Sequence, residues 1–199
     1  MKLIFSSFIL KCLDTIYSEL NSRGIKFRPK IYPSDSWGCP NKVPIIGVPY
    51  SYCYPIFSVI EEDRLLVDPI PILKILRHET GHTICYSYRL YERKDWIKLF
   101  GDFNLPYPTP VKNPNREDFI AYLPDCNGFY SCQHPDEDFA ETFGYWLENK
   151  PIYPSPYKKE NKALTKLDLV NKLMNEIDGK KPLVSGGKKD RPYKSVNFR

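Results

Sequence analysis

The segment His78-Glu79-Thr80-Gly81-His82 constrains this chain more than any other stretch, because it places two of the three histidines four residues apart. Residues i and i+4 face the same side of an α-helix, one turn apart. Both imidazoles can then reach one point in space, and Glu79 stands beside them. This spacing is typical of a helix that binds a zinc ion and leaves one coordination position open. The alternative is an ordinary polar helix face that carries two histidines.

The residues around this motif predict a buried helix. Asp68 suits the N-cap, and Pro69 suits the first helical position, where its missing N–H costs nothing. Apolar residues stand on both sides of the motif: Ile72, Leu73, Ile75, Leu76, Ile84 and Cys85. We therefore expect the histidines to lie deep in a domain, where metal coordination removes the cost of burying unpaired imidazoles.

The charge of the chain predicts one domain followed by a tail. The 199 residues carry a net charge of +5, but residues 179–199 hold seven Lys and Arg against one Asp. Residues 1–178 are left with 22 basic and 23 acidic residues, so we predict a near-neutral domain there and a basic, disordered tail over 179–199. The near-neutral domain disfavours nucleic acid as a partner. The tail alone could still tether the protein to nucleic acid or to acidic lipid.

The N-terminal segment predicts an amphipathic helix rather than a signal peptide. Its apolar run is short and is followed by Lys11 and Asp14 without a small-residue cleavage site. Apolar residues then repeat every three or four positions, and Gly24 suits the end of the helix. No segment is long enough to span a bilayer, and we expect a cytoplasmic protein. The sequence does not indicate an oligomeric state.

The six cysteines include no CxxC pair, which argues against a structural zinc ribbon. In a cytoplasmic protein we expect reduced thiols. Cys126 and Cys132 are the one sequence-close pair that could form a bridge, and they stand on either side of Tyr130.

The remaining pattern predicts a small sheet and a mainly helical C-terminal half. Alternating residues indicate strands over 25–32 and 43–50, and prolines at both ends of the second assign it to a sheet edge. Further strand is predicted over 56–67, and residues 101–116, with four prolines, are predicted to be irregular. Helices are predicted over 95–100, 135–149 and 161–177. The predicted fold class is α+β.

A catalytic zinc site usually has three protein ligands, so a third ligand must lie elsewhere in the chain. Glu137 and Glu141 are again four residues apart on a predicted helix and share one face. Alternatively, Asp136, Glu137 and Asp138 stabilise the positive end of that helix, and Glu141 is solvated. His134 is the remaining nitrogen candidate, unless it is a loop or capping residue. Spacing alone leaves these alternatives open.

The segments 76–82 and 134–143, the second reading HPDEDFAETF, resemble a bacterial family of zinc-binding metallopeptidases. The resemblance extends roughly from Tyr17 to Met174 and implies a zincin-like metallopeptidase domain, with an edge strand packed on the active-site helix. The E-x-x-x-E spacing is similar to that of gluzincins such as thermolysin and the lethal-factor-type toxins. This similarity implies Glu137 as the third zinc ligand and Glu141 as the hydrogen-bond acceptor of a zinc-bound histidine. Tyr130 matches the active-site tyrosine of the lethal-factor type.

These residues predict a zinc peptidase acting on peptide or protein substrates. One zinc ion held by His78, His82 and Glu137 would activate a water molecule, and Glu79 would accept its proton. Tyr130 would help to stabilise the oxyanion. An extended peptide would add to the predicted edge strand.

Two other functions compete with this prediction. The first is a protein-binding domain that keeps zinc without cleaving anything, and the presence of Glu79 argues against it because a structural site needs no general base. The second is a nucleic-acid-associated protease tethered by the basic tail.

Overall fold

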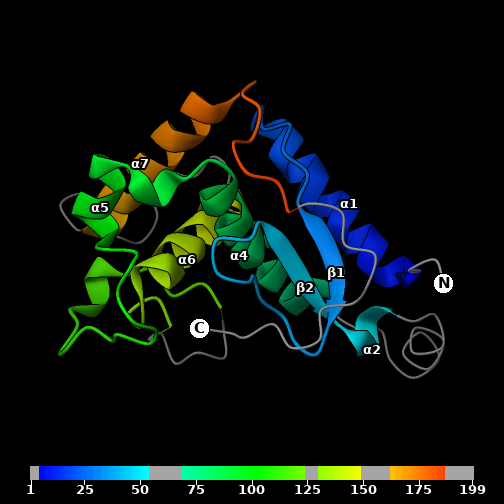
Figure 1. Cartoon of the computed structure of the whole chain (residues 1–199), viewed down its shortest axis with the longest axis horizontal. Coiled ribbons are helices and arrows are strands. Elements are labelled where there is room, and N and C mark those ends of the chain that lie inside the picture. The colour runs from blue at the N-terminus through cyan, green and yellow to red at the C-terminus, as the bar shows by residue number, and fades with distance from the viewer. Residues whose placement is uncertain (1–4, 54–68, 124–129, 149–161, 187–199) are drawn as a thin grey trace.

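A computed structural model describes residues 5–53, 69–123, 130–148 and 162–186 (Figure 1). Helices and a two-stranded sheet together give an α+β fold, which is the class predicted. Among the described residues, no helix has both the length and the apolar character needed to cross a bilayer. The elements in chain order are α1 (Ser7–Ser22), β1 (Lys30–Ser34), β2 (Ile45–Pro49), α2 (Tyr50–Cys53), α4 (Pro69–Ser87), η1 (Leu90–Glu92), α5 (Lys94–Phe100), η2 (Arg116–Asp118), α6 (Pro135–Glu148) and α7 (Lys162–Ile177).

Helix α1 has the ends that its sequence predicts. The Ser6 hydroxyl accepts a hydrogen bond from the backbone N–H of Ile9 at 3.4 Å, which caps the first turn. The helix ends before Gly24, whose φ of +81° lies in the left-handed region that glycine tolerates best. The amphipathic helix ended by Gly24 is therefore confirmed.

The sheet consists of β1 and β2, which run parallel and pair from Lys30 with Ile45 to Ser34 with Pro49. The first strand begins later than the predicted range of 25–32. The backbone N–H of Ile25 donates to Leu20 in α1 at 2.9 Å, and Tyr17 in the same helix donates to the carbonyl of Pro29 at 3.1 Å. The backbone before residue 30 is thus bonded to α1 instead of to the sheet.

Strand β2 lies within the predicted range of 43–50 and packs against α4, but its outer edge is not open. The N–H of Gly47 donates to the carbonyl of Gly38 at 2.8 Å, where the chain returns beside the strand. The N–H of Ile45 donates to Val43 at 2.8 Å, and Pro49 has no N–H to offer. The described backbone donors along that edge are therefore used or absent, and the addition of a peptide to this strand stays a prediction.

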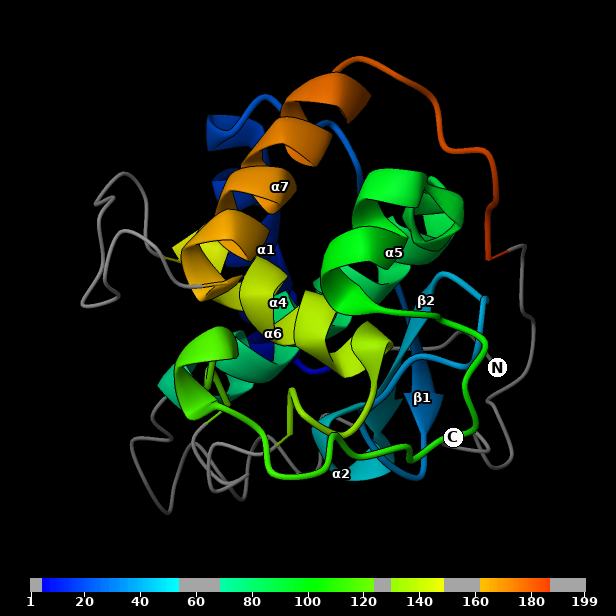
Figure 2. The same cartoon turned by 90° about the vertical axis from the view of Figure 1, so that its left-hand side faces the viewer.

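The centre of the molecule is the pair α4 and α6, which lie side by side (Figures 1 and 2). Their closest approach is at Gly81, inside the histidine motif. A Cβ atom added there would stand 3.0 Å from the Cα of Ala140 and 3.1 Å from the Cβ of Phe143. The absence of a side chain at this position therefore lets α6 rest directly on the face of α4 that carries the motif.

Two buried cations join the neighbouring helices to this pair. Arg77 in α4 forms ion pairs with Glu19 in α1 at 2.7 Å and with Glu148 in α6 at 2.9 Å. Lys166 in α7 forms an ion pair with Asp138 in α6 at 2.7 Å. The pair of Lys166 and Asp138 is buried on both sides, and removal of one partner from such a pair costs about 3–5 kcal/mol, so this contact holds α7 firmly against α6. Glu19 and Glu148 are partly exposed, so the two pairs of Arg77 contribute less.

The remaining predicted elements agree well with the structure. Helix α4 begins at Pro69, the helices α5, α6 and α7 match their predicted ranges to within about one residue, and residues 101–115 form neither helix nor strand. Asp68 and the strand predicted over 56–67 lie outside the described residues.

The C-terminal segment differs from the predicted tail. The N–H groups of Leu183 and Val184 both donate to the carbonyl of Ser87, at 2.8 and 3.0 Å, and the Tyr88 hydroxyl donates to the carbonyl of Lys180 at 3.1 Å. The last carbonyls of a helix lack partners within it, and these donors fill that need at the end of α4. Residues 179–186 thus pack on the domain, and residues 187–199 lie outside the described residues.

Candidate metal centre

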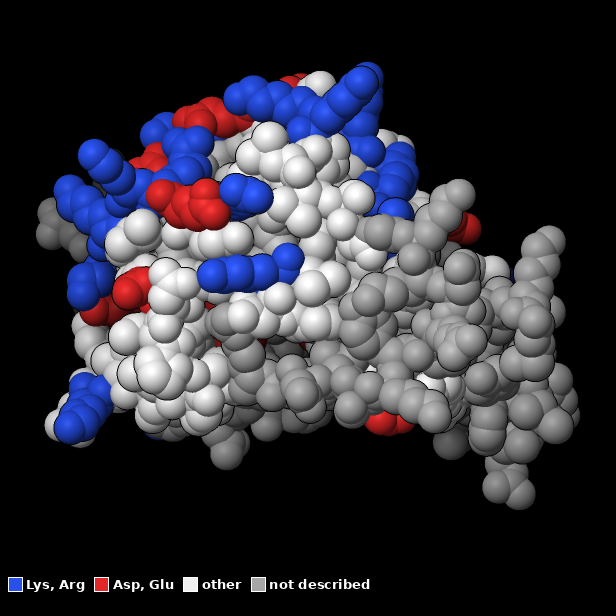
Figure 3. Space-filling model, viewed as in Figure 1, with Lys and Arg blue, Asp and Glu red and all other residues white. Residues whose placement is uncertain are grey.

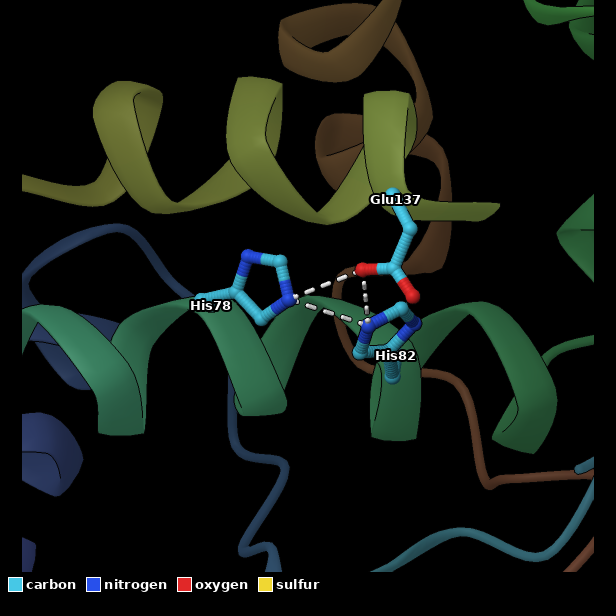
Figure 4. A group of neighbouring side chains, drawn as sticks. All are labelled: His78, His82 and Glu137. Atoms are coloured by element: carbon cyan, nitrogen blue, oxygen red, sulfur yellow. Dashed lines mark hydrogen bonds and ion pairs between the residues drawn. The ribbon is translucent and has the colours of Figure 1, made fainter. Parts of the chain in front are cut away.

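His78 and His82 project from the same face of α4 towards the first turn of α6 (Figure 4). Both are buried, and their Nε2 atoms stand 3.1 Å apart. Glu137 reaches them from α6, with its Oε2 atom 3.2 Å from Nε2 of His78 and 3.4 Å from Nε2 of His82. One atom from each of the three residues lies within 4.8 Å of the others.

Carboxylates behind the two imidazoles fix which ring nitrogens face this point. The Nδ1 atom of His78 stands 2.8 Å from Oε1 of Glu141, and Nδ1 of His82 stands 3.1 Å from Oδ2 of Asp136. The first contact is a hydrogen bond, whereas the second is a close charge contact without full hydrogen-bond alignment. An N–H at each Nδ1 leaves the Nε2 lone pairs directed at each other and at Glu137.

Three acceptor atoms that converge without a donor repel one another unless a cation stands between them. In the metal-free protein that cation is a proton. Burial alone would lower the pKa of His78, but hydrogen bonds to Glu137 and Glu141 raise it to about 9. Two imidazole nitrogens and one carboxylate oxygen are also the ligand set that zinc accepts. The residues present therefore fit a divalent metal ion.

Glu141 is fully engaged in holding this arrangement. Its Oε1 atom faces His78, and its Oε2 atom accepts hydrogen bonds from the backbone N–H groups of Tyr122 and Leu123 at 2.7 and 3.0 Å. The Glu141 carboxylate thus accepts hydrogen bonds from His78 and from two backbone N–H groups. Glu141 stands behind His78, on the side away from the point where Glu137 and the two Nε2 atoms converge.

Asp136 has the corresponding position behind His82, and the sequence did not reveal it. The Tyr86 hydroxyl donates to the Asp136 oxygen atom that faces His82. The sequence supported only a helix-end role for Asp136, because three consecutive acidic residues at a helix start are common. The sequence feature that could have identified Asp136 is its position directly before Glu137. This position directs the Asp136 side chain towards His82.

Glu79 lines a cavity of about 150 Å³ beside the three converging atoms. Its side chain is 7% exposed, and its Oε2 atom is buried without a hydrogen-bond partner in the described part of the chain. Burial raises the pKa of this carboxyl, and the charges of His78 and His82 oppose that rise. A carboxylate with one unpartnered oxygen, in a cavity next to residues that could hold a metal ion, is suited to accept a proton from a molecule bound there.

Three tyrosines line the same cavity: Tyr86, whose hydroxyl is bound to Asp136, and Tyr107 and Tyr130. The ring of Tyr130 stands 5.5 Å from the ring of His78, and its hydroxyl is hydrogen-bonded with that of Tyr107. Burial and the charge of Glu137 raise the pKa of both, that of Tyr107 to about 12. Both hydroxyls therefore stay protonated and can donate. Tyr107 was missed from the sequence because the proline-rich stretch around it has no periodicity to place its side chain.

The segment Trp37-Gly38-Cys39 closes another side of the cavity. The Cys39 thiol donates to the backbone carbonyl of Glu79 at 3.4 Å, which joins this segment to α4. No sequence pattern connects these residues with the motif, because the contact depends on how the chain returns beside β2.

His134 serves as a capping residue. Its Nδ1 atom accepts a hydrogen bond from the backbone N–H of Asp136 at 3.2 Å, and its Nε2 atom lies 3.1 Å from the carbonyl of Leu105. Both ring nitrogens are therefore engaged with backbone, and His134 is not part of the three-residue group. The buried thiol of Cys132 is free, and Cys126 lies outside the described residues.

Comparisons of the chain with known protein families, with characterised proteins and with solved structures find no match. The chemistry open to this site therefore follows from its side chains: His78, His82 and Glu137, which could hold a metal ion, stand beside a cavity lined by Glu79, Tyr107 and Tyr130.

Proposed function

We propose that this protein is a zinc-dependent peptidase with a zincin-like catalytic domain. The observation that carries the proposal is the position of Glu79, whose unpartnered oxygen lies in the cavity beside the converging atoms of His78, His82 and Glu137. A structural metal site needs no such group, and an unpaired buried carboxylate lowers stability. The resemblance of segments 76–82 and 134–143 to zinc-binding metallopeptidases supports the same proposal.

When bound, a zinc ion supplies a Lewis acid that makes water acidic and polarises a carbonyl group. The protein side chains do the rest. Glu79 accepts a proton from the attacking water and delivers it to the leaving amine. Burial raises the pKa of Glu79. The raised pKa favours both steps, because the carboxylate takes up a proton from water more readily and can still give that proton to the amine.

The tyrosines stabilise the charge that develops on the substrate. Tyr130 faces the cavity with a protonated hydroxyl and donates to the oxyanion of the tetrahedral intermediate. Tyr107 orients that hydroxyl through the hydrogen bond between them. Glu141 and Asp136 keep the two imidazoles directed at the metal, as carboxylates behind metal-bound histidines generally do.

The test compares the parent protein with Glu79→Gln and with Glu117→Gln, a matched change at an exposed position in η2. Each protein is analysed for bound zinc and then incubated with an unbiased peptide library, with chelator and after zinc is added back. We expect about one zinc per chain in all three, and cleavage that is lost by orders of magnitude only in Glu79→Gln. Equal cleavage by Glu79→Gln, or an intact library with the zinc-loaded parent, would refute the proposal.

A further inference from the structure

A second cavity, of about 360 Å³, lies at the far end of α4 and shares no lining residue with the cavity of the metal centre. One wall is formed by the segment that follows α1, and the other by residues 179–186, which follow α7. Phe27 and Tyr88 lie between these walls with their rings in edge contact, 6.1 Å between centroids. Both rings are partly exposed.

Positive charge is concentrated around this cavity. Five of its lining residues are basic and none is acidic: Lys26, Arg28, Lys30, Lys180 and Lys181. Figure 3 shows Lys and Arg side chains along the upper edge of the molecule, over the end of α7 and the segment that follows it. Clustered charge of one sign raises the local concentration of ligands of the opposite sign.

Both walls are held in place by contacts outside the cavity. Arg28 donates to the side chain of Asn21 at 2.7 Å and stacks over the ring of Tyr17 at 4.8 Å. Opposite it, Leu183 and Val184 are bonded to the end of α4. A site whose walls are already ordered loses less entropy when a ligand binds.

All five cations are exposed. Lys26, Arg28 and Lys30 are exposed, whereas Phe27 between the first two is partly buried and Pro29 between the last two is buried, so the three cations share one side of an extended segment. In the part of the chain that the structure describes, Lys26, Lys180 and Lys181 form no salt bridge. Like charges at this density repel one another, and an anion bound between the walls would relieve that repulsion.

We propose that this cavity binds a small ligand with several adjacent phosphate groups, such as a nucleotide polyphosphate. Lysine ammonium and arginine guanidinium groups are the usual partners of phosphate oxygens. The volume is that of a small-molecule site rather than of a groove for a polymer. The partly exposed rings of Phe27 and Tyr88 offer an apolar surface for a base or sugar beside the phosphates. This inference does not depend on the proposed peptidase activity.

The test is calorimetric titration of the full chain with sodium tripolyphosphate, ATP and tetraglutamate at two salt concentrations. One variant, Lys26→Gln with Arg28→Gln, alters the first wall, and another, Lys180→Gln with Lys181→Gln, alters the second. The matched control, Lys11→Gln with Lys98→Gln, removes the same charge at exposed positions outside the cavity. All variants keep the candidate metal centre and the residues after 186. Heat from ligand binding at either of these places therefore appears equally in the parent and in every variant.

We expect tripolyphosphate to bind with a stoichiometry near one and more weakly at higher salt. Each wall variant should lower its affinity by about 10-fold, and the control by less than about 2-fold. Tighter binding of ATP than of tripolyphosphate would support a contact between the rings and a base. Absence of tripolyphosphate binding, equal losses in control and wall variants, or equally tight binding of tetraglutamate would overturn the proposal.

Discussion

Glu141→Gln tests whether the carboxylate behind His78 controls metal binding. In the parent, this side chain accepts from three donors, which are the N–H groups of His78, Tyr122 and Leu123. Glutamine has one acceptor oxygen and one donor group, so it cannot satisfy all three. If its oxygen keeps the two backbone N–H groups, its amino group faces Nδ1 of His78. The imidazole then has to carry its proton on Nε2, where the metal binds.

The size of the effect follows from what is lost. One charge-assisted hydrogen bond disappears, and the favoured tautomer of His78 changes. The loss of a hydrogen-bond partner behind a metal ligand typically lowers metal affinity 10- to 100-fold, or about 1.4–2.7 kcal/mol. The assay is competition for zinc with a chromophoric chelator at fixed pH. Glu148→Gln, a matched change at the other end of α6, should leave the affinity within about 2-fold, since its carboxylate faces Arg77 and not a ligand. A folded Glu141→Gln protein with the parent's zinc affinity would refute the reasoning.

Three further predictions concern packing, catalysis and pH. Gly81→Ala forces α6 away from α4, so it should lower zinc affinity at least about 10-fold and the free energy of unfolding by up to about 2 kcal/mol. Unchanged zinc affinity in competition with a chelator would contradict this prediction. Tyr130→Phe should lower kcat by about 10- to 1000-fold at unchanged zinc content; an unchanged kcat would remove its role as donor. Because neighbouring carboxylates raise the pKa of both histidines in the metal-free protein, that of His78 to about 9, zinc binding at pH 7.5 should release protons and tighten as pH rises towards 9. Calorimetry in buffers of different ionisation enthalpy measures this release, and its absence would exclude a protonated His78.

Local periodicity was sufficient for the parts of the site that lie on one helix. The i, i+4 spacing brings His78 and His82 together on α4. The same spacing puts Glu137 and Glu141 on one face of α6 but left a helix-end role open, and only the resemblance of residues 134–143 to metallopeptidases assigned them to the histidines. The helix ends were also predictable, because capping residues and glycines act within a few positions.

Contacts between distant segments could not be predicted in this way. The lining of the cavity by Tyr107 and Cys39 depends on irregular chain and on the return at Gly38, and neither leaves a periodic signal. The first strand was placed too early because alternation does not reveal that α1 takes the hydrogen bonds of residues 25–29. Residues 179–186 were assigned to a disordered tail because their composition is basic and polar, whereas their backbone bonds to Ser87 depend on no side chain.

The division of the metal-binding group between α4 and α6 affects when a metal can bind during synthesis. Glu137 is 55 residues after His82, which corresponds to about 3–11 s of translation at typical elongation rates of about 5–20 residues per second. During that interval the nascent chain presents two histidines and no carboxylate from α6. A metal ion captured then has only two protein ligands and exchanges readily. Binding by all three residues would require that α6 has left the ribosome and packed on Gly81, so the chain would select a metal only after most of the domain has been made.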